Sequence, residues 1–178
     1  VDISHSRILD SEGEDGLNVK NARFSIERTV FSGHRADAFD GDWVEGEIVA
    51  THFLDNGNDG LDLSGAKVLI RDTVLSGMGD KAVSVGEQSR ADMVNCRIED
   101  SVFGATAKDL SLLRIYASSI KGNRYGIATY LKKPLFGGGR VEMFGGLLWD
   151  NDDNFYTDPV SGATLAGVGI AALPRLES

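Results

Sequence analysis

The feature that most constrains this chain is a step of 22 residues at which side chains of one kind recur. From Gly16 the step reaches only small residues, namely Gly16, Ala38, Gly60, Ala82, Gly104 and Gly126. The position that follows is always apolar, with Leu17, Phe39, Leu61, Val83, Ala105 and Ile127. The next position is mostly polar and the one after it mostly apolar again. A fixed step of this length is typical of a solenoid.

The alternation inside each unit predicts a short strand with one buried face. It is clearest in the segment Asp59–Ser64, where a turn is followed by apolar and polar residues in alternation. No single unit of this size buries its apolar face alone, so successive units must stack and pair in parallel. The sequence therefore predicts an all-β fold, a parallel β-helix (solenoid) of about seven coils with a 22-residue repeat.

The repeat also divides the chain. We assign residues 1–156 to the β-helix domain and residues 157–178 to a C-terminal tail or cap, with Gly162–Ala172 expected to cover the last coil. One insertion lies within Leu131–Gly139, at a position where the pattern predicts a turn. The chain opens inside a strand-like pattern, so we expect it to be a piece of a longer polypeptide.

The same register predicts the core. Leu61, Leu63, Ile70 and Leu75 should be buried, whereas Asp62 and Ser64 should face solvent. Coil five, residues 81–102, carries one extra residue at its first turn, which shifts the later inward positions by one. Cys96, the one cysteine, lies beside an apolar position and is interpreted as a buried structural thiol.

Net charge restricts the classes of partner. The chain has a net charge of −9, which argues against nucleic acid, because phosphates bind to a basic face. No apolar run approaches the roughly 20 residues of a membrane span, so none is expected. An acidic chain is compatible with a bound cation or with a neutral or cationic partner.

Three segments resemble the right-handed parallel β-helix repeat family, which shares the pectate-lyase-like fold. They are Asn56–Ser64 (NGNDGLDLS), Gly79–Gly86 (GDKAVSVG) and Tyr125–Ala128 (YGIA). The resemblance implies a right-handed helix, in agreement with the general hand of parallel crossovers. The family includes polysaccharide lyases, epimerases and hydrolases, phage tailspikes and non-catalytic surface domains. The chain also resembles modules of larger bacterial surface proteins, which implies an extracellular or cell-surface location.

Many enzymes of that family bind polysaccharide in a groove over one strand face. In this chain the equivalent polar face predicts a binding surface made of Asn18, Lys20, Asp40, Asp42, Asp62, Ser64, Thr106, Lys108 and Tyr130. Within it, Lys108 and Tyr130 are residue types that a lyase uses as base or acid. The Asp-Pro-His sequence of alginate-type epimerases and the signatures of polygalacturonase-like hydrolases are missing from the chain.

Asp40, Asp42 and Asp62 are the candidate metal ligands. Stacked carboxylates repel one another unless one is protonated or a cation lies between them. Three of them within reach could hold Ca²⁺, which prefers oxygen ligands, or could supply an acid and a base. The third interpretation is a solvated polar face with Lys20 partly neutralising Asp42. The three histidines share no ligand spacing, so no zinc site is expected.

Two functional hypotheses follow from the sequence. The first is a non-catalytic β-helix module of a bacterial surface or secreted protein, acting as a rigid spacer or as a glycan-binding surface. The second is a polysaccharide lyase, epimerase or hydrolase acting on an acidic glycan. The missing catalytic signatures and the short chain favour the first. In both, the expected partner is a polysaccharide or cell-surface glycan, and Ca²⁺ is the one cofactor that the residues suggest.

Overall fold

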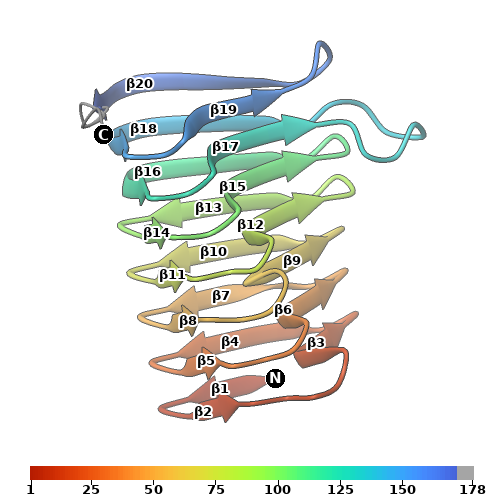
Figure 1. The fold of residues 1–178 in the computed structure, drawn as a ribbon. Helices are drawn as coiled ribbons and strands as arrows, with labels where there is room; N and C mark the ends of the chain where they lie inside the picture. Colours follow the sequence, from red (N-terminus) through yellow and green to blue (C-terminus); the bar gives the residue numbers. More distant parts are fainter. Residues whose placement is uncertain (172–178) are drawn as a thin grey trace.

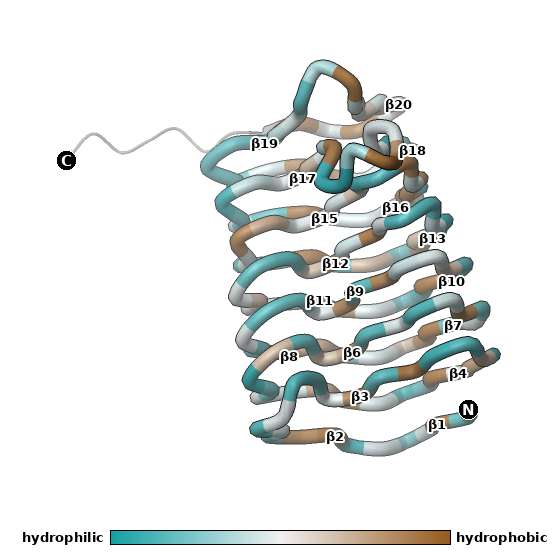
Figure 2. Tube along the Cα trace, turned by 90° about the vertical axis from the view of Figure 1, so that its right-hand side faces the viewer, coloured by the Kyte–Doolittle hydropathy of each residue, from teal (hydrophilic) through white to brown (hydrophobic). Residues whose placement is uncertain are grey.

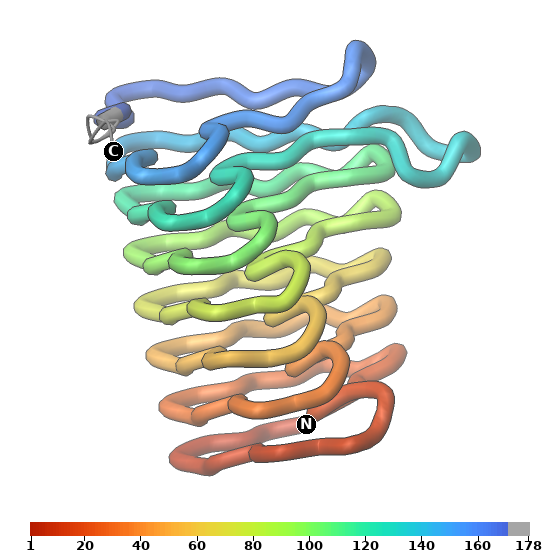
Figure 3. The backbone as a smooth tube through the Cα atoms, in the orientation of Figure 1, coloured from red at the N-terminus to blue at the C-terminus, as the bar shows by residue number. Residues whose placement is uncertain are grey.

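Strand pairing between successive coils organises the whole chain. The computed structural model describes residues 1–171, which wind into a parallel β-solenoid of about eight turns without any helix. Figures 1 and 3 show the coils stacked in chain order, with the N-terminus at one end and β20 at the other. In these residues there is accordingly no helix that could span a membrane. The predicted all-β solenoid with its 22-residue repeat is confirmed.

One face of the solenoid is a parallel sheet, here called sheet B. Within residues 1–171 it has seven strands, namely β3 (Asp15–Lys20), β6 (Asp37–Asp42), β9 (Leu61–Ser64), β12 (Lys81–Gly86), β15 (Phe103–Lys108), β17 (Tyr125–Tyr130) and β19 (Asp153–Thr157). Each strand pairs with the corresponding strand of the next coil, so equivalent residues form columns along the solenoid.

The other strands form sheet A, which has two arms. The first arm contains β1 (Asp2–Ser4), β4 (Arg23–Glu27), β7 (Glu45–Val49), β10 (Lys67–Arg71) and β13 (Arg90–Val94). The second arm contains β2 (Arg7–Leu9), β5 (Val30–Ser32), β8 (His52–Leu54), β11 (Val74–Ser76) and β14 (Arg97–Glu99). The arms join in the long strands β16 (Leu112–Lys121), β18 (Arg140–Trp149) and β20 (Gly162–Ala171).

The core consists of inward columns. Leu61, Leu63, Ile70 and Leu75 are fully buried, as the repeat predicts. A further column of Phe31, Phe53, Leu75, Ile98 and Ile120 is in register from coil to coil. Its first two rings stack with centroids 4.8 Å apart. Hydrophobic and hydrophilic residues alternate along the strands in Figure 2, as expected for strands with one buried face.

Coil five contains the extra residue that the pattern requires. Val68 pairs with Ala91, which is one residue beyond the strict step. The additional residue is accommodated at Glu87 and Gln88, which both have positive φ at the corner after β12. A corner absorbs an insertion easily because its side chains point into solvent.

Hydroxyl and thiol side chains line the corner between the two arms of sheet A. Thr29, Thr51, Thr73, Cys96 and Ser118 occupy equivalent positions there. The hydroxyls of Thr51 and Ser118 accept hydrogen bonds from backbone N–H groups of the preceding coil, at 3.4 and 3.0 Å. Cys96 is buried in this ladder, and burial raises its pKa to about 11. The prediction of a buried structural thiol is confirmed.

Aspartate and glycine alternate at the corner after the second arm. Successive coils place Asp10, Gly33, Asp55, Gly77, Asp100, Gly122 and Asp150 at this position, all with positive φ. The carboxylates of Asp10, Asp55 and Asp100 lie over the glycines of the next coils. A Cβ on Gly33, Gly77 or Gly122 would lie 2.3, 2.3 or 2.4 Å from their Oδ1 atoms. No side chain fits at these glycines while the aspartates stay in place.

The C-terminal boundary differs from the expected one at residue 156. β19 ends at Thr157, and β20 then pairs in parallel with β18 over its whole length. The solenoid therefore continues through residue 171, and β20 covers the coil of β18 as the expected cap would, instead of forming a separate tail after residue 156. The segment is rich in glycine and alanine, which hides its register, but Ala163 and Leu165 pack against the core. Residues 172–178 of the expected cap lie outside the described part.

The core register can be tested at Leu63. Leu63→Ala should lower the free energy of unfolding by about 2–5 kcal/mol, because it leaves a cavity between stacked coils. Leu69→Ala is the matched control, since Leu69 points outward from β10, and its effect should stay within about 0.5 kcal/mol. Urea denaturation measures both, and equal losses from the two variants would contradict the register.

Candidate functional site

The outer face of sheet B carries all nine residues of the predicted binding surface. The register places Asn18, Asp40, Asp62 and Thr106 in one column. It places Lys20, Asp42, Ser64, Lys108 and Tyr130 in the next. Their environments differ along the axis: Asn18 and Lys20 are exposed, Asp40, Asp42, Asp62, Ser64 and Tyr130 are half-buried, and Thr106 and Lys108 are buried.

The N-terminal half of this face is acidic. Asp40 is half-buried among other carboxylates, and its pKa is raised to about 7 by burial first and then by the charges of Asp42 and Asp15. Asn18 donates a side-chain hydrogen bond to Asp40 Oδ2. Lys20 forms an ion pair with Asp42 at 3.0 Å. The charges of this half are therefore balanced locally by an amide, a lysine and a carboxyl that holds its proton up to neutral pH.

Lys108 makes the contact that the sequence pattern did not predict. Its side chain is only 4% exposed and runs back over Gly86, where a Cβ would lie 2.8 Å from Lys108 Cε. The ammonium group reaches Asp62 Oδ1 at 3.7 Å, two coils away, as an ion pair rather than a hydrogen bond. Lys108 was expected in an open groove, but here it is closed in against the sheet.

The insertion lies at the flank of sheet B, beside the Lys108 contact. The backbone N–H groups of Lys132 and Lys133 both donate to Asp109 Oδ1, at 2.8 and 2.7 Å. The Lys133 side chain forms an ion pair with Glu87 in the corner after β12. Figure 1 shows this loop, between β17 and β18, projecting beyond the other corners. Through these contacts the loop is held against the edge of sheet B, next to the buried Lys108 side chain.

A second buried pair lies in the column at the start of these strands. Lys81 Nζ is 3.5 Å from Asp59 Oδ1, and the Lys81 backbone N–H donates to the same oxygen at 3.0 Å. Burial raises the pKa of Asp59 to about 7, although Lys81 opposes the shift. Burial also raises the pKa of the Tyr130 phenol, which therefore stays protonated at neutral pH.

Aromatic side chains continue that column toward the C-terminus. Phe103 and Tyr125 stack with centroids 5.0 Å apart, and Tyr156 packs on both at 5.9 and 5.3 Å. Tyr156 is 47% exposed. The sequence search did not single out this column as a candidate site, but the 22-residue step from Lys81 leads on to Phe103 and Tyr125 and would have found the cluster.

Three carboxylates were predicted to bind a cation on this face. Asp42 and Asp62 each have a lysine partner, and Asp40 is bonded to Asn18. Among residues 1–171, no group of three or more His, Cys, Asp or Glu side chains is arranged to hold a metal ion. The calcium site stays a prediction, and a bound ion would compete with both lysines.

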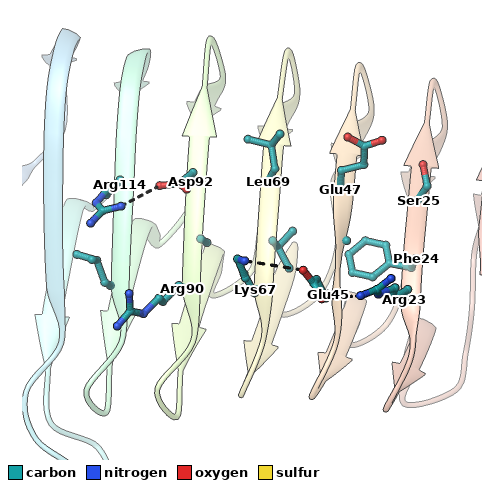
Figure 4. Close-up of a pocket in the computed structure, with 14 residues that line it drawn as sticks. Arg23, Phe24, Ser25, Glu45, Glu47, Lys67, Leu69, Arg90, Asp92 and Arg114 are labelled. Atoms are coloured by element: carbon teal, nitrogen blue, oxygen red, sulfur yellow. Dashed lines mark ion pairs between the residues drawn. The ribbon is translucent and has the colours of Figure 1, made fainter.

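An open cleft lies elsewhere, on the outer face of the first arm of sheet A (Figure 4). Its volume is about 660 Å³. Arg23 and Lys67 flank Glu45 at 3.6 and 3.8 Å, and Arg114 lies 4.0 Å from Asp92. This surface was missed because the sequence search followed only the polar face of sheet B. The sequence feature that indicates this surface is a charged residue at the first position of each strand of the first arm.

Comparison with known proteins identifies the class to which this fold belongs. Residues 1–135 match the family model described as "Right handed beta helix region", so the chain belongs to the right-handed β-helix family. No curated protein matches the chain.

Solved structures of the "periplasmic alginate epimerase AlgG" and of its T265N mutant are similar in fold. Their TM-scores are 0.62 and 0.66, each at 13% sequence identity. Each match covers 96% of this chain and 50% of the other, so this chain spans about half the length of those structures. Likeness at this identity shows the fold alone.

Asp40 and Asp59 make stability depend on pH. Their folded-state pKa of about 7 exceeds the ordinary value of 3.8, so the folded protein binds more protons than the unfolded chain between these values. Stability should therefore fall as pH rises from about 4 through about 7. Asp40→Asn should make this fall shallower in urea titrations, while Asp152→Asn, in an exposed turn, should leave it unchanged. An unaltered slope in Asp40→Asn would contradict the assignment.

The calcium prediction is tested by comparing two salts. A bound ion that prefers the folded state raises the melting temperature, so CaCl₂ should raise it more than NaCl of equal ionic strength. Lys20→Ala frees Asp42 and should enlarge this difference. Equal shifts from both salts, in the parent and in the variant, would leave only a screened acidic surface.

Proposed function

We propose that the chain is a non-catalytic β-helix module of a bacterial surface or secreted protein and that it binds glycans. The stacked coils form a rigid rod whose outer surface is set by backbone pairing. Such a rod presents side chains at regular intervals without the ordering cost of a flexible loop. Rigid spacing and glycan binding are compatible roles for the same module.

The burial of Lys108 carries the non-catalytic part of the proposal. A base or acid must come within hydrogen-bonding reach of the substrate. Lys108 lies under the rim formed by Glu87 and Lys133, and its ammonium already pairs with Asp62. The Lys108 ammonium is therefore enclosed and paired within the sheet, beside the buried hydroxyls of Ser84 and Thr106, which supports a structural role for this part of sheet B.

The likeness to AlgG supports a polysaccharide as partner and a location outside the cytoplasm. The matched structures are of a protein described as periplasmic and as an alginate epimerase. Because this chain spans about half of them at 13% identity, neither property transfers directly. Both belong to the proposal and rest on fold likeness together with the exposed aromatic and charged surfaces.

A polysaccharide lyase, epimerase or hydrolase of acidic glycans is the second candidate. The observation in its favour is a pair of carboxyl groups with pKa about 7, Asp40 and Asp59, on the face that also carries Lys81 and Tyr130. Groups that titrate near neutral pH are typical of acid and base catalysts, although structural charge networks produce the same shift.

The two candidates are separated by incubating the protein with a panel of uronate and neutral polysaccharides. We expect binding to at least one of them but no unsaturated product in the ultraviolet, no change in sugar configuration by NMR and no new reducing ends. Elimination, epimerisation and hydrolysis each leave one of these signatures. Product that forms with the parent protein but not with a folded Tyr130→Phe variant would establish the enzymatic candidate instead.

A further inference from the structure

Trp43 is an exposed aromatic side chain at the corner where β6 of sheet B leads into β7 of sheet A. It is 62% exposed, and its backbone has a φ of 51°. The indole lies over the corner of the next coil, since a Cβ on Gly65 would be 2.7 Å from Trp43 Cδ1. A flat apolar ring held in solvent suits the C–H face of a sugar, as aromatic residues in binding sites do.

A row of charged side chains begins the strands of sheet A beside this corner. The register aligns Arg23, Glu45, Lys67, Arg90, Leu112 and Arg140 along the solenoid. Arg90 and Arg140 form no ion pair with any residue in the range 1–171, and Glu45 is the one acid of the row. This excess of cations contrasts with the net charge of −9 of the whole chain.

Two adjoining clefts meet along this row. The cleft of about 660 Å³ lies over the first arm of sheet A, and one of about 580 Å³ reaches from it to Trp43. Arg23, Glu45, Lys67 and Arg90 line both. Figure 4 shows these side chains projecting from successive strands on the same side of the sheet. The aromatic ring and the cations therefore border one continuous hollow.

We propose that this hollow, the Trp43 strip (Trp43, Arg23, Lys67 and Arg90), binds an acidic polysaccharide. Guanidinium groups pair with carboxylates in a two-pronged geometry, and the indole supplies an apolar platform for the ring between them. A neutral glycan would use the indole but not the cations. The strip recognises a chain of uronates, in which every ring carries both an apolar face and a carboxylate.

The spacing of the row fits a linear polymer. Successive strands lie about 4.8 Å apart, so Arg23 and Arg90, three strands apart, are separated by about 14 Å along the axis. A polymer lying along the solenoid axis passes each cation in turn. Several exposed pairs act together in this arrangement, which compensates for the small contribution of each one alone.

This inference rests on the proposed glycan-binding function and gives it a place and a ligand class. The place differs from the predicted surface on sheet B, since none of those nine residues lines either cleft. It also explains how an acidic chain can bind an acidic polymer. The larger cleft also contains Glu45, Glu47 and Asp92, but Arg23, Lys67 and Arg114 pair with Glu45 and Asp92, and Arg90 is left for the polymer. The aspartates of β3, β6 and β9 lie on sheet B.

The test is calorimetric titration of the protein with a defined polyuronate oligosaccharide at low salt. Trp43→Asn places at this corner the residue that Asn21 supplies one coil earlier at a φ of 52°, so the backbone is kept. We expect it to weaken binding by about tenfold or more, and Arg90→Gln by about three- to tenfold. Binding should also weaken as NaCl is raised.

Glu45→Gln gives a result that misfolding cannot imitate. Glu45 lies between Arg23 and Lys67 and repels an anionic ligand, so its neutralisation frees both cations. We expect tighter binding of the polyuronate in this variant. The same oligosaccharide with its carboxylates reduced to alcohols should lose most of its affinity for the parent protein.

Matched controls separate the strip from other surfaces. Tyr156→Ala removes an exposed aromatic residue from sheet B, and Arg71→Gln removes an exposed cation from β10 outside both clefts. Neither should change the affinity. Loss of binding in Tyr156→Ala, with Trp43→Asn and Arg90→Gln unaffected, would overturn the strip but leave the glycan-binding function standing.

The remaining outcomes also decide between the two proposals. Equal affinity for the carboxyl-reduced oligosaccharide would overturn the acidic ligand class. Equal affinity for a single-stranded oligonucleotide would overturn selectivity for a glycan. If no oligosaccharide of the panel binds at all, both the strip and the proposed glycan-binding function fail.

Discussion

Every coil forms its backbone hydrogen bonds with the coils above and below it, and the rest of the structure depends on this pairing. Equivalent residues are thereby held about one strand spacing, or about 4.8 Å, apart. In the core this stacks Phe31 on Phe53. On the outside it places like charges next to each other, since Asp40 lies directly beside Asp62, with Asn18 on its other side. The chain has to neutralise on its surface the repulsion that its repeat creates.

Long side chains provide that neutralisation. Lys20 reaches across to Asp42 in the next coil, and Lys108 crosses two coils to Asp62. Asp40 instead retains a proton up to neutral pH. Sheet B is therefore largely occupied with its own charges, whereas the strip beside Trp43 leaves Arg90 unpaired by any residue in the described part. The two faces of one solenoid thus differ in what they offer a ligand.

The sequence predicted the properties that follow from period and polarity. The strand register, the burial of Leu63 and the extra residue of coil five could be read from a single chain. The direction of a flexible side chain could not be read from the sequence. Lys108 was expected in solvent because its position in the strand points outward. Candidate functional positions were also missed where the residue type changes along a column. Phe103 follows Lys81 in its column, and Trp43 lies between Asn21 and Gly65 in another. The small residues of β20 carried too little contrast to show that the solenoid continues.

The alternation of aspartate and glycine after the second arm gives the solenoid a parity. The Asp55 carboxylate fits over Gly77, and the Asp100 carboxylate of the following coil fits over Gly122. Each aspartate therefore needs a glycine in the next coil. Removing one coil would bring Asp55 against Asp100 or Gly33 against Gly77, so one junction would be crowded with charge or left empty. Shortening or lengthening this rod by two coils keeps every junction matched. Although the chain repeats every 22 residues, its unit of growth is a pair of coils.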